Sequence, residues 1–148
     1  MLPVAASPTN HPENLADLPE RCRAALAWLA VSQEATGNGG SSAYYVPFYG
    51  WFPVYPETTG YIVPTLYRGA EALGTPEFAE RAERMARWLL TVQFDNGAFP
   101  GGVLGPHGPG APSVFNTAQI LFGLVAAAQR TGDTAFDTAA QKAARWLV

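Results

Sequence analysis

The stretch GTPEFAERAERMARWLLTVQFDNG, residues 74–97, decides the fold because GDTAFDTAAQKAARWLV, residues 132–148, restates it near the end of the chain. Gly74 recurs as Gly132, Phe78 as Phe136, and the Arg-Trp-Leu triplet around Trp88 as that around Trp146, all at one constant offset. Residues 59–70 align with residues 117–128 at the same offset, and apolar residues match apolar residues over most of this length. These matches predict an internal repeat of about 58 residues.

Each repeat is predicted to contain two helices of different character. Residues 120–128 carry no charge and predict an inner helix that neighbours cover on several sides. The following helix of each repeat is amphipathic and predicts an outer helix with one face in water, with an apolar stripe of Phe78, Ala82, Met85 and Leu89 in the first copy. Gly74 and Gly132 stand where a left-handed glycine would end the inner helix, and Thr75 and Asp133 are candidate N-caps of the next.

A third, partial copy precedes these two, since Trp28 and Gln33 match Trp88 and Gln93 at the same separation from each other. The patterns together predict an all-α protein with helices at about residues 18–33, 60–73, 76–92, 117–130 and 134–148. Pro64 would remove a backbone hydrogen bond from the first inner helix, which predicts a kink or a late helix start at residues 61–64.

Composition excludes several classes of function. The net charge of −3 and the lack of any Lys/Arg run argue against binding to nucleic acid. The sequence has no apolar run of about 18 residues, so no membrane span is predicted. The single Cys22 and two histidines have no spacing typical of a metal site, so we expect no metal or cofactor. Residues 1–17 lack the regions of a signal peptide and are interpreted as a loose leader, which favours a cytoplasmic protein.

Two long loops, residues 37–58 and 94–116, each precede an inner helix, so we expect both at the same end of the molecule. The first loop is unusually rich in aromatic residues, as a wall around a ligand or a lid over the helical core would be. The candidate substrate-binding residues on the two loops are Tyr44, Tyr45, Tyr49, Trp51, Phe99, His107 and Asn116.

The tandem of inner and outer helices, with ends such as Gln93-Phe-Asp-Asn-Gly97, resembles the α/α-toroid superfamily. That group holds terpenoid cyclases, protein prenyltransferase β-subunits, lanthionine cyclases and the related α/α barrels of glycoside hydrolases, polysaccharide lyases and sugar epimerases. Residues 55–61 also resemble a segment of prenyltransferase-like proteins encoded with polysaccharide biosynthesis genes. The resemblance implies that residues 18–148 form a partial toroid, with a ligand cavity where the inner helices begin.

A saccharide is the ligand that the residues favour, because the first loop combines flat aromatic rings with hydroxyl and carboxylate groups. Glu57 and Asp95 could act as a carboxylate pair, and Tyr55 could transfer a proton, in a hydrolase, lyase or epimerase. Alternatively, Glu57 caps the inner helix and Asp95 tightens a turn before Gly97. His107, between glycines and prolines, is also consistent with a solvated loop residue.

Two other hypotheses stay open. The chain could be a non-catalytic helical-repeat fragment or assembly module, or a protein related to terpenoid cyclases and prenyltransferases. The cyclase hypothesis requires an acidic cluster, and the transferase hypothesis requires a zinc site, neither of which the residues supply. An open ring would leave apolar residues of the inner helices bare, such as Ile120, Leu121, Leu124 and Val125. This predicts that the chain forms a homodimer or is part of a longer chain.

Overall fold

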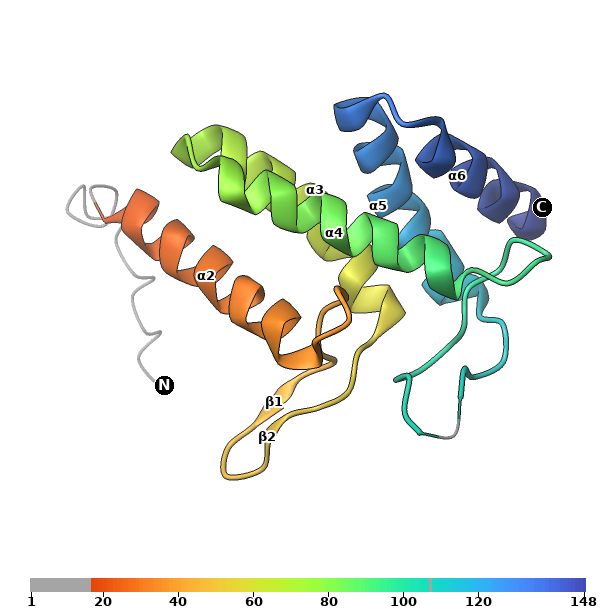
Figure 1. Cartoon of the computed structure of the whole chain (residues 1–148), viewed down its shortest axis with the longest axis horizontal. Coiled ribbons are helices and arrows are strands. Elements are labelled where there is room, and N and C mark those ends of the chain that lie inside the picture. The colour runs from red at the N-terminus through yellow and green to blue at the C-terminus, as the bar shows by residue number, and fades with distance from the viewer. Residues whose placement is uncertain (1–16, 107) are drawn as a thin grey trace, which may run out of the picture.

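The computed structural model describes residues 17–106 and 108–148, and its main elements are α-helices (Figure 1). The elements are α2 (Leu18–Thr36), β1 (Tyr45–Val46), β2 (Gly50–Trp51), α3 (Pro56–Leu73), α4 (Pro76–Val92), α5 (Val114–Thr131) and α6 (Thr134–Leu147). The two strands form one short antiparallel hairpin between α2 and α3. The prediction of an all-α protein is confirmed. The expected leader, apart from Asp17, lies outside the described residues.

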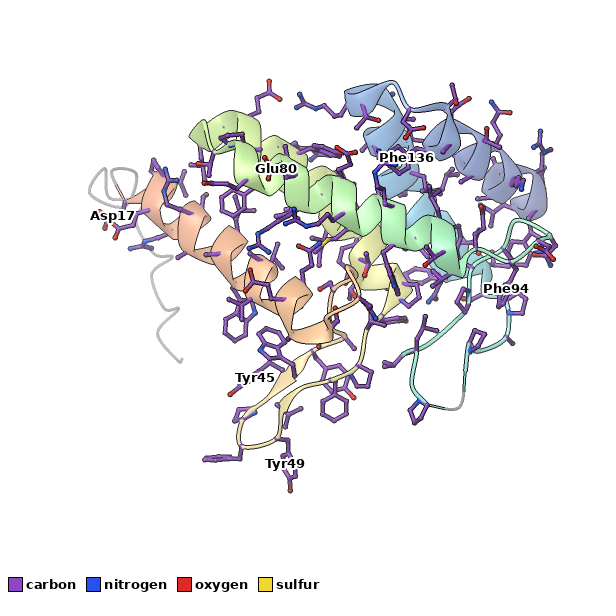
Figure 2. The ribbon with its side chains drawn as sticks, viewed as in Figure 1. Asp17, Tyr45, Tyr49, Glu80, Phe94 and Phe136 are labelled. Carbon is purple, nitrogen blue, oxygen red and sulfur yellow. The ribbon has the colours of Figure 1, made fainter. Side chains whose placement is uncertain are left out.

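Helices α3 and α5 pack side by side, and each carries a neighbour on its outer side, α4 on α3 and α6 on α5. Helix α2 lies against α3 and touches α4. Charged residues of the outer helices point away from this core, as Glu80 does in Figure 2. The largest fully buried side chains come from the four helices α3 to α6 and from the second loop: Leu66, Met85, Leu89, Phe99, Ile120, Leu124 and Phe136.

The two central helices approach backbone to backbone at Gly60 and Gly123. A Cβ atom added to Gly60 would lie 2.6 Å from the Cα of Ile120, and one added to Gly123 would overlap the carbonyl oxygen of Gly60. Pro64 has no N–H to donate to that carbonyl, which instead lies against the facing helix. The missing helical hydrogen bond therefore falls where the backbones of α3 and α5 approach closely.

Helix α3 begins earlier than the sequence predicts. Pro56 occupies its first turn, where the missing N–H of proline leaves no hydrogen bond unmade, and the helix then continues through Pro64 to Leu73. Of the kink or late start expected at residues 61–64, the late start is wrong, whereas the kink stays a prediction. Helix α5 likewise starts at Val114 instead of residue 117, because the side chain of Ser113 accepts a hydrogen bond from the N–H of Asn116 and caps it.

The turns between paired helices form as predicted. Gly74 and Gly132 end α3 and α5 with φ angles of 61° and 70°, in the left-handed region that favours glycine. Asp133 caps α6 by accepting a hydrogen bond from the N–H of Ala135 at 2.9 Å. Thr75 is the N-cap residue of α4 without a side-chain cap bond, and its hydroxyl accepts instead from Arg23 of α2 at 2.9 Å.

Hydrogen bonds that fix the loop of the first half have counterparts at equivalent positions of the second half. The N–H of Ser41 donates to the hydroxyl of Thr59 at 2.8 Å, and the N–H of Phe99 donates to the hydroxyl of Thr117 at 2.9 Å. A glutamine near the end of each preceding helix joins the next loop to the neighbouring helix. The side-chain amide of Gln33 donates to the carbonyls of Gly39 and Arg81. In the second half, the side-chain amide of Gln93 donates to the carbonyls of Gly97 and Ala139. The loops are thus attached in the same way in both halves.

The residues expected to be bare on α5 are only partly so. Ile120 and Leu124 are fully buried in the core, contrary to the expectation, because they lie on the side of α5 that faces α3 and its neighbours. Val125 is exposed, and Phe115 and Phe122 are exposed with it. Of the four residues expected to be bare only Val125 is exposed, and Leu121 is half-buried against the core, so the homodimer stays a prediction.

Candidate functional site

The two long loops lie at the same end of the helices, below α3 and α5 in Figure 1. They touch each other, since the N–H of Leu104 in the second loop donates to the carbonyl of Val54 in the first at 2.9 Å. The first turns of α3 and α5 begin at this end. The expectation that the loops gather where these helices start is therefore met.

The hairpin of the first loop is attached at its base through Ser42. This buried residue donates its hydroxyl to the carbonyl of Phe52 at 2.5 Å and its N–H to the carbonyl of Ser32 in α2 at 3.2 Å. Pairing of the strands sets Tyr45 opposite Trp51. The side chains of this pair are therefore held at a fixed distance from α2.

Three aromatic rings cluster where the hairpin meets α2. Trp28 of α2 lies 4.8 Å from the ring of Trp51 and 5.6 Å from that of Tyr45, measured between ring centroids. Tyr45 and Trp51 meet edge to face at 5.2 Å. An open pocket of about 490 Å³ lies beside the cluster, and further residues lining it include Ser32, Ser41, Ser42, Tyr44, Thr58 and Tyr61. We call it the aromatic pocket.

The tip of the hairpin projects away from the helices. Figure 2 shows Tyr49 there, and its side chain points into solvent. The N–H of Tyr49 donates to the carbonyl of Val46 at 3.0 Å and closes the turn, which sets Phe48 at a φ angle of 71° with its ring fully exposed. A bulky residue rarely adopts this left-handed conformation. Nearer the base of the hairpin, the rings of Tyr44 and Phe52 stack with centroids 4.3 Å apart.

A second group of polar side chains lies between the starts of α3 and α5. The hydroxyl of Tyr55 donates to a carboxylate oxygen of Glu57 at 2.5 Å, and the side-chain amide of Asn116 donates to the same hydroxyl at 3.4 Å. The amide is oriented by a further bond at 3.3 Å to the carbonyl of Pro100, and its oxygen accepts from Ser113 at 2.9 Å. The structure thus brings together three of the predicted site residues, which we call the Tyr55 triad: Tyr55, Glu57 and Asn116.

The environment of the triad favours a protonated Tyr55. Burial raises the pKa of the Tyr55 hydroxyl, and the hydrogen bond to Glu57 raises it further, whereas the bond from Asn116 lowers it. The pKa of Tyr61, which borders the aromatic pocket, is also raised, first by burial and then by the negative charge of Glu57. Glu57 therefore lies close enough to both tyrosines to act on their ionisation.

The remaining predicted site residues lie elsewhere. Asp95 is exposed in the turn after α4, and no hydrogen bond or ion pair joins its carboxylate to any residue that the structure describes. Its neighbour Gly97 lies against Lys142 of α6, so this turn belongs to the outer side of the fold. Phe99 is fully buried in the core and offers no surface to a ligand. His107 lies outside the described residues.

Sequence reasoning missed several residues of the pocket. Trp28 looks in the sequence like a packing anchor equivalent to Trp88, yet 51% of it is exposed, against 8% for Trp88. Its partners Tyr45 and Trp51 reach it only because the hairpin folds back onto α2, which no periodic pattern predicts. The hydroxyls of Ser32 and Thr58 could have been found as polar residues flanking the aromatic loop.

Comparison with known proteins gives no match to a family model, to a curated protein or to a solved structure. Among the described residues, no helix is both long and apolar enough to cross a membrane. The same part of the chain has no cluster of three or more histidine, cysteine or acidic side chains arranged to bind a metal ion. The arguments for function accordingly rest on the aromatic pocket and the Tyr55 triad.

Proposed function

We propose that this chain is the saccharide-binding part of a carbohydrate-active protein, and that the sugar lies in the aromatic pocket. The observation that carries the proposal is the grouping of Trp28, Tyr45 and Trp51 beside a pocket whose wall also includes hydroxyl groups. Apolar walls with a few placed polar groups are typical of small-ligand sites. A pyranose fits this pattern because its C–H faces pack on aromatic rings while its hydroxyls need hydrogen-bond partners.

Proton transfer by the Tyr55 triad would make the protein a lyase or epimerase more readily than a hydrolase. Most glycoside hydrolases use two carboxylates that flank the scissile bond. Asp95, the only proposed partner of Glu57, shares no hydrogen-bond network with it in the described residues. A carboxylate bonded to a protonated tyrosine instead suits removal and return of one proton, with Glu57 as the base and Tyr55 as the acid.

The proposed architecture is a partial α/α toroid in which a unit of one inner and one outer helix is repeated along the chain. The paired hydrogen bonds of Thr59 and Thr117 support it, because they attach each loop to the start of an inner helix in the same way. The side-by-side packing of α3 and α5 under α4 and α6 supports it too. A non-catalytic binding or assembly module is the second candidate, favoured because neither Tyr55 nor Glu57 is among the residues that line the pocket.

Binding is tested by titrating oligosaccharides, both neutral and uronic, while thermal unfolding is followed by circular dichroism. A ligand that binds only the native state raises Tm by mass action. We expect at least one sugar to raise Tm of the natural chain and to lose this effect in Trp51→Ala. Phe122→Ala, which removes an exposed ring that does not line the pocket, is the matched control and should respond like the natural chain. If no sugar raises Tm, the proposal fails.

Catalysis is tested separately with Glu57→Gln and Tyr55→Phe on whichever sugar binds. Glu57→Gln keeps the shape and one acceptor but removes the charge, so turnover should be abolished while the Tm shift on binding remains. Tyr55→Phe should lower turnover in the same way if its hydroxyl returns the proton. Full turnover by both variants would leave the binding module as the correct interpretation.

A further inference from the structure

An apolar groove lies between α2 and α3. It has a volume of about 510 Å³, and the residues lining it are Leu18, Pro19, Cys22, Ala25, Leu26, Leu29, Thr65, Arg68, Gly69, Ala72 and Leu73. Arg68 is the one charged residue in this set. Leu18, Cys22 and Ala25 are exposed. Helix α2 therefore presents to solvent an apolar face of the kind that is buried in other helices of the chain.

Helix α4 shows what covers the same face in the next unit. The alignment that matches Trp28 to Trp88 also matches Leu18 to Phe78 and Ala25 to Met85. Leu18 is 51% exposed, whereas Phe78 is 7% exposed and Met85 is fully buried. The difference arises because α4 has α3 packed along it, while the corresponding place beside α2 holds no described helix.

We propose that the groove between α2 and α3 binds an apolar α-helix of a partner protein, packed on α2 as α3 packs on α4. The helix would run antiparallel to α2, and its other side would lie against α3 beside the exposed Ala72, because Gly69 is already in contact with the side chain of Leu26. The inference is independent of the saccharide site, which lies at the loop end of the molecule.

The chemistry of the groove specifies the helix further. Between α3 and α5, Glu71 pairs with Arg130 across the two central helices. The position that corresponds to Arg130 in α3 is Ala72, and Arg68 lies one helical turn before it on the same face. Arg68 makes no ion pair with any residue that the structure describes. The bound helix should therefore be largely uncharged and carry a carboxylate that meets Arg68, as Glu71 of α3 meets Arg130.

The test uses the thiol of Cys22, which lines the groove and corresponds to the fully buried Ala82 of α4. Its reaction with a chromogenic aromatic disulfide is timed on the full chain, alone and with a synthetic peptide of residues 56–73 as the probe helix. At about ten times the Kd of the peptide, occupancy of the groove should slow the reaction about tenfold. A scrambled peptide of the same composition should leave the rate unchanged.

Two single substitutions on α2 distinguish the groove from its surroundings. Ala25→Glu places a charge in the groove and should abolish the protection of Cys22 by the peptide. Ala24→Glu is the matched control: it adds the same charge on the neighbouring position, which lies outside the groove and corresponds to the exposed Arg84. Protection by the peptide should persist in Ala24→Glu.

A fusion guards against a weakly binding peptide. Residues 56–73 attached before Met1 of the full chain through a flexible glycine–serine linker make binding intramolecular, at an effective concentration of the order of millimolar. The fusion should protect Cys22 and raise Tm, and Ala25→Glu should reverse both effects. An unprotected Cys22 in both formats overturns the proposal. So does a Cys22 that is already unreactive in the chain alone, because the chain or a second copy would then cover the groove itself.

Discussion

The two long loops share their attachment but differ in their surfaces. Both are held by a backbone N–H bonded to a buried threonine at the start of an inner helix, Thr59 in one case and Thr117 in the other. The first loop then extends as an aromatic hairpin, whereas the second directs its Phe99 into the core. One scaffold thus carries two different loops, and the residues that fix a loop in place are separate from those that give it a surface.

A similar contrast separates the outer helices. Helix α4 is covered along its apolar face, but α2 has part of the corresponding face open to solvent. Positions of α2 and α4 that the sequence alignment matches can therefore be core in α4 and surface in α2, depending on which helix packs beside them.

The largest expected effect is a difference in the free energy of unfolding between variants of the two tryptophans, one on each of these helices. Trp88 is buried and packs against Gly40 of the first loop, so Trp88→Ala should lower the free energy of unfolding by about 3 to 5 kcal/mol. Trp28 is half exposed, and Trp28→Ala should cost about 1 kcal/mol or less. Urea unfolding followed by far-ultraviolet circular dichroism measures both values. Equal losses would show that the two helices do not differ as the burial indicates.

A smaller effect tests whether the two loop attachments are equivalent. Thr59→Val and Thr117→Val keep the side-chain shape but leave the N–H of Ser41 or Phe99 without its partner, which should cost about 1 to 3 kcal/mol each. The same urea experiment applies. A large loss in one variant with none in the other would break the comparison between the loops.

The smallest effect concerns the residue after the N1 proline of α3. Glu57 lies there and helps to raise the pKa of Tyr55 and of Tyr61. The corresponding position of α5 is Phe115, which carries no charge. Removing the charge in Glu57→Gln should lower the pKa of both hydroxyls toward the ordinary value of 10.0, and burial should keep them above it. A titration of phenolate absorbance measures this shift, and Tyr55→Phe and Tyr61→Phe assign the two steps.

The same shifts set the direction of a pH effect on stability. Because the folded-state pKa values of Tyr55 and Tyr61 are raised, their contribution is fully present below pH 10.0 and is lost as pH rises through the folded values. The free energy of unfolding should therefore fall less steeply above pH 10.0 in Glu57→Gln than in the natural chain. Identical slopes would mean that Glu57 does not influence either tyrosine.

Much of the fold follows from local rules that the sequence states directly. The apolar stripe of α4, the glycines at positions 74 and 132 and the N-cap Asp133 each act within a few residues, so they locate helices and turns correctly. The errors lie at two helix starts, where Pro56 and Ser113 begin α3 and α5 earlier than the hydrophobic pattern suggests, and at the end of α2, which continues to Thr36 instead of residue 33. Capping there depends on backbone geometry and on a single side-chain bond, which periodicity does not report.

By itself the sequence predicted that the chain is helical, where the helices lie, and which two loops carry the candidate site, with Tyr44, Tyr45, Trp51, Tyr55, Glu57 and Asn116 among its residues. Only the tertiary structure decided that Asn116 reaches Tyr55, that Asp95 lies in an outer turn, and that Trp28 faces a pocket while Trp88 is buried. The physical reason is that helix formation and capping depend on neighbours along the chain. Burial and side-chain contact depend instead on which distant segment packs beside each residue.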